Sequence, residues 1–91
     1  MSIFVASKCL ERKFGSATKK QIMMFLAGKA SDDGSGIWCS KRSIAKLTEL
    51  NISTVKRVMR GFKKDLFIFE TGQRPNSHGF TIEYSIDLLF L

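Results

Sequence analysis

The sequence has few residues of the kinds that bind metals or carry out catalysis. It contains one histidine, His78, and two cysteines, Cys9 and Cys39, which lie far apart and belong to no CxxC pair. A structural zinc site needs about four such ligands, so we expect no metal. The sequence has no glycine-rich phosphate loop, and its scattered carboxylates cannot be grouped with a nucleophile and a base. The chain is therefore not expected to be an enzyme or to bind a cofactor.

Long apolar runs are also lacking. No stretch approaches the roughly 18 apolar residues that a membrane-spanning helix needs. The apolar run before Lys8 is too short for the core of a signal peptide. We therefore expect no membrane partner and a cytoplasmic location, in the bacterial cytoplasm or nucleoid. In that reducing compartment both cysteines would act as small apolar packing residues.

Acidic residues are outnumbered, and proline is almost absent. Eight Asp and Glu stand against 15 Lys and Arg, and the resulting net charge of +7 favours a polyanionic partner. With one proline, Pro75, and 44% hydrophobic residues, the composition is that of a folded chain and not of a disordered one. The 91 residues predict a single domain, spanning residues 1–91, with one modest core.

Two helices are predicted before residue 31. The first runs from Ile3 to Phe14, between a capping Ser2 and a terminating Gly15, and either covers the core or mediates dimerisation. Its core side would carry Ile3, Val5 or Ala6, Cys9, Leu10 and Phe14. The second begins at Thr18, because Thr18 and Gln21 form the T-x-x-Q pattern of a capping box. Its buried face would carry Ile22, Phe25, Leu26 and Ala30, with Met23 and Met24 as flanking core residues.

A loop and a short strand are expected next. The stretch SDDGSG at 31–36 is a loop by composition, and it lacks the third acidic position and the closing Glu of a calcium loop. Residues 36–39 are apolar and predict a small strand. We expect Trp38 to pack within the protein, although a partly exposed indole could also lie on a partner surface.

The stretch SKRSIAKLTELNISTVKRVMRGFKK, at 40–64, has the pattern of a helix-turn-helix. It consists of two amphipathic segments of about three turns each, joined by a break at 49–53. Ser40 would cap the first segment, whose buried residues would be Ile44, Ala45, Leu47 and Leu50. In the second, the apolar stripe consists of Val55, Val58, Met59 and Phe62. The opposite side carries Ser53, Lys56, Arg57, Arg60, Lys63 and Lys64. One face is suited to burial and the other to an anionic partner.

The cations of this stretch differ in how strongly they indicate an anionic partner. Lys41 and Arg42 lie in a first helical turn, where positive charge opposes the helix dipole. Phosphate binding would explain this placement, and an ordinary solvated basic turn is the alternative. Lys63 and Lys64 lie at a helix carboxyl end, which they would stabilise with or without a partner.

After the second segment the period changes from helical to two. Leu66 to Thr71 reads as one strand, and GFTIEYSIDL as another with Phe80, Ile82, Tyr84, Ile86 and Leu88 on one face. The intervening GQRPNSHG reads as a loop and not as a two-residue turn, with His78 as a solvated residue in it. The final LLFL would close the core, form a dimer surface, or mark where a longer chain was cut.

The stretch IWCSKRSIAKLTELNISTVKRVMRGFKKDLFIFETG resembles the winged-helix domains of small phage and plasmid regulators and of replication initiators. These domains share an aromatic-Ser entry, a recognition helix that starts with S-T-V, and a following two-stranded wing. The resemblance covers roughly residues 18–86. It implies an α+β winged helix-turn-helix with three to four helices, a carboxyl-terminal two-stranded antiparallel wing and, optionally, a short third strand. The helix-turn-helix would span 40–64 and the wing 66–87.

One residue departs from the family pattern. Glu49 stands at the corner where glycine is usual, because the chain takes a left-handed conformation there. The corner is therefore either a longer turn, spread over Leu50 to Ile52, or a strained one.

The resemblance also implies roles for individual side chains. Base-reading residues would be Asn51, Ser53, Thr54, Lys56, Arg57 and Arg60. Phosphate-contacting residues would be Ser40, Lys41, Arg42, Lys63, Lys64, Arg74 and Asn76. Arg57 and Arg60 are the preferred base readers, since a planar guanidinium can make two directed bonds to guanine. Lys56 could read a base or only neutralise phosphate, and Arg74 would act from the wing, on the backbone or in a minor groove.

The expected function is sequence-specific binding of double-stranded DNA by a transcriptional regulator of a bacterium, phage or mobile element. Two alternatives stay open: the origin-binding domain of a phage or plasmid replication initiator, and a winged-helix interaction module that does not bind DNA. A homodimer is an open possibility, because one small recognition surface provides limited specificity.

Overall fold

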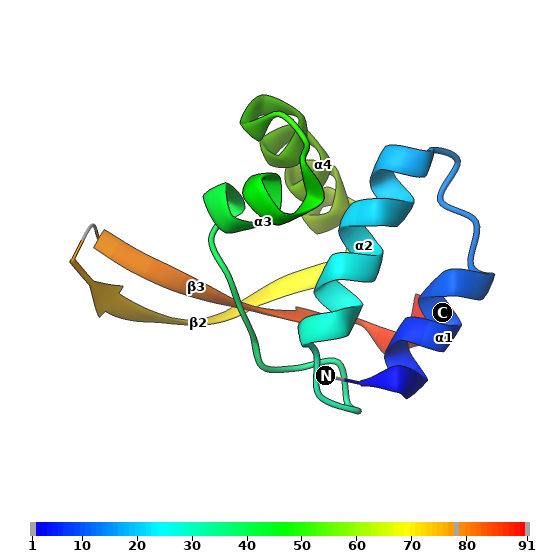
Figure 1. Ribbon diagram of the computed structural model, residues 1–91. Helices are drawn as coiled ribbons and strands as arrows, with labels where there is room; N and C mark the ends of the chain where they lie inside the picture. Colours follow the sequence, from blue (N-terminus) through cyan, green and yellow to red (C-terminus); the bar gives the residue numbers. More distant parts are fainter. Residues whose placement is uncertain (1, 78, 91) are drawn as a thin grey trace.

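The structure is a computed structural model that describes residues 2–77 and 79–90 (Figure 1). Its α-helices are α1 (Ile3–Glu11), α2 (Ala17–Lys29), α3 (Lys41–Thr48) and α4 (Ile52–Lys64). Its strands are β1 (Ile37–Trp38), β2 (Ile68–Asn76) and β3 (Gly79–Ile86), followed by the 3-10 turn η1 (Leu88–Phe90). The strands form one antiparallel sheet in the order β1-β3-β2. The predicted α+β class, the helix number and the optional short strand are confirmed.

Helix α1 starts where predicted and ends earlier. The Ser2 hydroxyl accepts a bond from the Val5 amide at 3.1 Å. The helix stops at Glu11 and not at Phe14. Lys20 donates to the carbonyl oxygens of Leu10, in the last turn, and of Arg12, the C-cap residue. A lysine from α2 thus satisfies carbonyls that the helix itself leaves unpaired.

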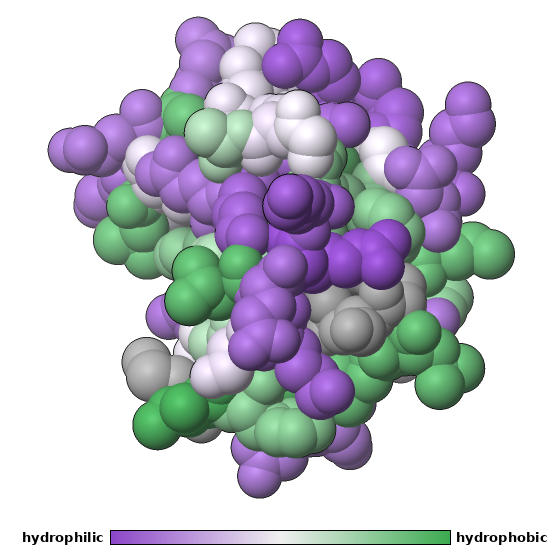
Figure 2. Space-filling model, turned by 90° about the vertical axis from the view of Figure 1, so that its right-hand side faces the viewer, coloured by the Kyte–Doolittle hydropathy of each residue, from purple (hydrophilic) through white to green (hydrophobic). Residues whose placement is uncertain are grey.

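Two apolar residues of α1 do not face the core as predicted. Ile3 is 79% exposed and Leu10 is 62% exposed, whereas Val5 and Cys9 are fully buried. At about 100° per residue, Ile3 and Leu10 lie on the side of the helix opposite to Val5 and Cys9. With Phe4, they place exposed apolar surface on α1. Figure 2 views the side of the molecule on which α1 lies and shows hydrophobic residues mainly in its lower part, below a hydrophilic upper part.

Helix α2 begins at Ala17, and its cap is Ser16 instead of Thr18. The Ser16 hydroxyl accepts from the Lys19 amide at 3.3 Å. Gln21, the other half of the predicted capping box, instead donates to the Thr48 carbonyl oxygen at 2.8 Å. Its side chain therefore ties α2 to the end of α3. Met23 lies fully buried in the core and not on the flank.

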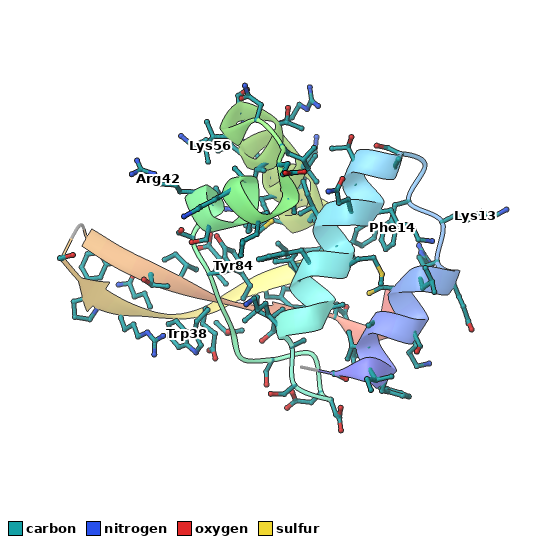
Figure 3. The ribbon with its side chains drawn as sticks, viewed as in Figure 1. Lys13, Phe14, Trp38, Arg42, Lys56 and Tyr84 are labelled. Atoms are coloured by element: carbon teal, nitrogen blue, oxygen red, sulfur yellow. The ribbon has the colours of Figure 1, made fainter. Side chains whose placement is uncertain are left out.

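The helices cover one face of the sheet, and the core lies between them (Figures 1 and 3). Tyr84 on β3 lies in this layer and is 1% exposed, and burial raises the pKa of its hydroxyl to about 12. Phe14, Phe62 and Phe67 form an aromatic cluster with ring centroids 6.1 to 6.2 Å apart. The short β1 pairs with β3 in the register Ile37 to Tyr84.

The corner between α3 and α4 is left-handed at a single residue. Glu49 has φ 60° and ψ 29°, and the Leu50 amide donates to the Ala45 carbonyl oxygen at 3.1 Å. The corner is thus not a longer turn spread over Leu50 to Ile52. Leu47 is 62% exposed, contrary to prediction, because Thr48 takes the buried position one turn after Ile44. The Thr48 hydroxyl donates to the Ile44 carbonyl oxygen at 2.5 Å.

The hairpin of β2 and β3 is longer than predicted. The strands pair from Ile68 with Ile86 to Asn76 with Gly79, so the predicted eight-residue loop is wrong. Pro75 fits within β2 because β2 is an edge strand, where a missing amide donor is tolerated. The far half of the hairpin extends beyond the helices (Figure 1). Phe80 lies there and is exposed instead of facing the core. A register shift between Glu70 and Gly72 interrupts the pairing.

The described leucines of the carboxyl-terminal apolar segment differ in burial. Leu88 packs against the core, and Leu89 is 94% exposed. The expectations for His78 and for Leu91 lie outside the described residues. None of the described helices is both long and apolar enough to cross a membrane.

Candidate nucleic-acid interface

Helix α4 has one buried face and one basic face. Asn51 caps it by accepting from the Ser53 amide at 2.9 Å and the Ser53 hydroxyl at 2.6 Å. The buried residues are Val55, Val58, Met59 and Phe62, as predicted. The other side exposes Lys56, Arg57, Arg60 and Lys64. The periodicity that buries the valines thus turns four cations toward solvent.

The amino terminus of α3 is a second basic element. Ser40 caps it, as predicted, by accepting from the Ser43 amide at 3.0 Å. Lys41 and Arg42 follow directly, and the first turn, which is described in full, contains no acidic residue. Figure 3 shows Arg42 of α3 and Lys56 of α4 pointing to the same side of the molecule, above the hairpin.

The two helices enclose a hollow of about 210 Å³ that we call the basic hollow. Its lining residues in the described part are all cations: Lys41 from α3 and Lys56, Arg60 and Lys63 from α4. Like charges repel by about 1 kcal/mol at 4 Å even in water, so such a set is stabilised by an anion. Lys63 already has one partner, because its ammonium group lies 2.9 Å from the Glu70 carboxylate.

A groove of about 580 Å³ separates the start of α3 from the hairpin, and we call it the hairpin groove. Its walls include Ser40, Arg42 and Arg74. The Arg74 guanidinium lies 4.3 Å from the centroid of the Trp38 ring, in a cation–π contact. The ring also reaches Gly72, where an added Cβ would lie in ordinary van der Waals contact with it, 3.7 Å from Trp38 Cη2. The partly exposed tryptophan thus lines the groove and holds Arg74 beside it.

Five lining residues of the hairpin groove were not assigned to a site from the sequence: Trp38, Cys39, Ser43, Phe80 and Thr81. The pairing of Trp38 with Arg74 depends on the register between β1, β3 and β2, which local sequence does not specify. The alternating pattern that predicted β3 assigned Phe80 to the core. It could not indicate that this end of the hairpin extends beyond the helices.

The structure brings most of the predicted contact residues to one region. Some of their side chains are exposed, and others are hydrogen-bonded or partly buried. Lys56, Arg57 and Arg60 are exposed, whereas the Asn51 oxygen and the Ser53 hydroxyl bond to each other. Thr54 is partly buried. The Ser40 hydroxyl is likewise engaged, with Ser43. Arg74 stacks on Trp38, and the phosphate contact predicted for Asn76 falls on a side chain outside the described part. None of the contacts within the described part tests the predicted DNA-contact roles, which stay predictions.

Cys9 is not among the residues that line the hollow or the groove, whereas Cys39 lines the hairpin groove. Cys9 and Cys39 are free and buried, and burial raises the pKa of each thiol to about 11. A thiol with so high a pKa is a poor nucleophile and metal ligand at neutral pH. Within residues 2–77 and 79–90, no three His, Cys, Asp or Glu side chains are grouped as a metal site would require.

Comparison of the chain with protein-family models, with curated proteins and with solved structures gives no match.

Proposed function

We propose that this protein is a winged-helix domain that binds double-stranded DNA sequence-specifically and acts as a transcriptional regulator. In this proposal α4 is the recognition helix in the major groove, and α3 supports it across the left-handed corner at Glu49. The β2–β3 hairpin is the wing, which follows the backbone or the adjacent minor groove. The sequence resemblance and the net charge of +7 support the same function.

The basic hollow is the observation that carries this proposal. It joins Lys41, at the start of α3, to Lys56 and Arg60 on the exposed face of α4. A helix start donates amide groups toward an anion, and cations beside it strengthen that preference. A phosphate at this position would fix the orientation of α4, so that residues further along its exposed face could meet base edges.

The side chains divide into two groups in this proposal. Arg57 and Arg60 are exposed on α4 and are the preferred readers of guanine. Lys41, Arg42 and Lys64 contact phosphates, as does Arg74 from the wing. Lys63 contributes less than its charge suggests, because Glu70 already neutralises it. Asn51 and Ser53 contribute chiefly by fixing the start of α4.

Salt dependence of duplex binding is the first test. About six phosphate contacts would give a log-log slope of binding constant against salt concentration of about −5. Selection of duplexes from a random pool should then return a defined site. Binding that is independent of salt would exclude the proposal.

Two substitutions test the division of roles. Lys41→Ala should weaken selected and random duplexes alike, whereas Arg57→Ala, outside the basic hollow, should lower the preference for the selected site by about 1–3 kcal/mol. Lys46→Ala removes the same charge from an exposed position of α3 that does not line the basic hollow, and it should have little effect. If Lys46→Ala and Lys41→Ala weaken binding equally, the basic hollow is not the phosphate site.

A further inference from the structure

A pocket of about 520 Å³ lies on a different flank of α4 from the basic hollow. It is bounded by the connection between α1 and α2, the first turn of α2, and α4. Phe14, Phe62 and Phe67 provide an apolar floor, and we call this cavity the Phe pocket. Figure 3 shows Phe14 pointing toward the interior, while its neighbour Lys13 points away from the molecule.

Gly61 keeps the Phe pocket open. It lies inside α4, where glycine costs about 0.5–1 kcal/mol relative to alanine. A Cβ added at Gly61 would meet no atom of the described residues within 4 Å, so close packing does not require glycine there. The position faces the pocket, where any larger side chain would occupy the free volume.

The charged groups of the Phe pocket are unevenly distributed. Lys19 in the first turn of α2 and Arg57 on α4 line it together with Lys13. That turn of α2, described throughout, has no acidic residue, so its lysine and the positive end of the helix dipole favour an anion. The one acidic lining residue of the described part, Asp65, is the C-cap of α4, eight positions after Arg57 and so about 12 Å further along the helix axis. An anionic group would therefore bind at the Arg57 end.

We propose that the Phe pocket binds a small aromatic carboxylate. The ring system lies on the three phenylalanine rings, which provide edge and face contacts for an aromatic guest. The carboxylate points to Lys19 and Arg57, away from Asp65. The proposal does not rest on the function proposed above, because the site is formed by the protein alone.

The probe is 2-naphthoate, titrated into the whole chain without DNA and followed by calorimetry and amide NMR shifts. It should bind saturably and shift the amides of Phe14, Gly61 and Phe67. The neutral isostere 2-naphthamide should bind about tenfold or more weakly, because it lacks the charge. Inorganic phosphate, which lacks the ring, should compete poorly.

Two variants locate the ligand. Gly61→Leu fills the pocket with a good helix former and should abolish naphthoate binding while far-UV circular dichroism stays unchanged. Lys19→Gln should weaken binding about fivefold to tenfold, and Lys46→Gln, with the same charge change on α3, should leave it unchanged.

Three results would overturn the proposal: equal affinity for naphthoate and naphthamide, full binding by the folded Gly61→Leu variant, or phosphate binding as tightly as naphthoate. The first would remove the role of the cations. The second would move the ligand elsewhere, and the third would make the cavity an anion site that does not use the phenylalanine floor.

Discussion

Glu49, like Leu66, is a non-glycine residue of the described part whose backbone lies in the left-handed region. Its φ of 60° lies in the left-handed region, where a side chain costs roughly 1 kcal/mol, and its side chain is exposed. We expect Glu49→Gly to raise the free energy of unfolding by up to about 1 kcal/mol and the melting temperature by several degrees, measured by calorimetry.

Lys46→Gly provides the matched control for this substitution. It introduces the same residue within α3 at an exposed helical position and should lower stability by about 1 kcal/mol. If Glu49→Gly destabilised the protein as much as Lys46→Gly does, the carboxylate of Glu49 would have a stabilising contact that outweighs the backbone strain.

The two buried thiols make stability depend on alkaline pH. Burial raises the pKa of Cys9 and Cys39 from the ordinary value of 9.0 to about 11. Between these values the unfolded chain has released its thiol protons and the folded chain has kept them, so the folded state binds more protons. The free energy of unfolding therefore falls as pH rises through this window, by about 2 kcal/mol per thiol.

Urea titrations at pH 8 and at pH 10.5 would measure this loss. The comparison is with the Cys9→Ala/Cys39→Ala protein, which lacks the thiols and keeps Tyr84 and every other titratable group. The native protein should lose more stability over this range than the variant does. Equal losses would show that the thiols are solvated or do not ionise on unfolding.

Single residues also show what local sequence can predict. Ser2 and Ser40 were predicted as caps, because each precedes a clear apolar stripe. Ser16 was missed, because Thr18 and Gln21 satisfy a local capping rule equally well. The competing contact, from Gln21 to the Thr48 carbonyl, lies 27 residues away and is a property of the tertiary structure.

At the scale of elements, α4 combines a clear pattern with one unfavourable residue. Gly61→Ala should raise the free energy of unfolding by about 0.5–1 kcal/mol, since the added methyl group meets open space. Gly28→Ala in α2, where a Cβ also has free room, serves as the comparison and should give a smaller gain because Gly28 lies in the last turn. A loss of stability in Gly61→Ala would mean that the added methyl group meets neighbouring atoms and not open space. Chemical denaturation measures all three proteins.

The predictability of the elements follows from their surroundings. The buried face of α4 was predicted in full, because four apolar residues at helical spacing have one geometrical solution. The loop between β2 and β3 was predicted wrongly, since Gly72 and Pro75 are residues that usually interrupt strands. Both are accommodated by the edge position of β2 and by the register shift beside Gly72, and neither property can be read from a single segment.

At the scale of the whole molecule, the candidate site was partly accessible from sequence. Lys56 and Arg60 follow from the periodicity of one helix, and Lys41 was identified by its unfavourable place in the helix dipole. Their meeting in one hollow requires the corner at Glu49, and the contact between Arg74 and Trp38 requires the sheet. The amphipathic pattern thus identifies the residues of the candidate site, and the topology determines which of them lie together.

Arg57 links the two proposed sites, because it is exposed on the basic face of α4 and also lines the Phe pocket. A carboxylate that holds its guanidinium in the pocket withdraws it from a base edge, so 2-naphthoate should weaken binding to the selected duplex by about fivefold or more. Linkage requires the duplex to weaken naphthoate binding by the same factor, and calorimetry in both orders of addition would measure the pair. In Gly61→Leu, where the pocket is filled, naphthoate should leave duplex affinity unchanged. If naphthoate lowers duplex affinity equally in this variant, its effect is general competition for cations and does not pass through the Phe pocket.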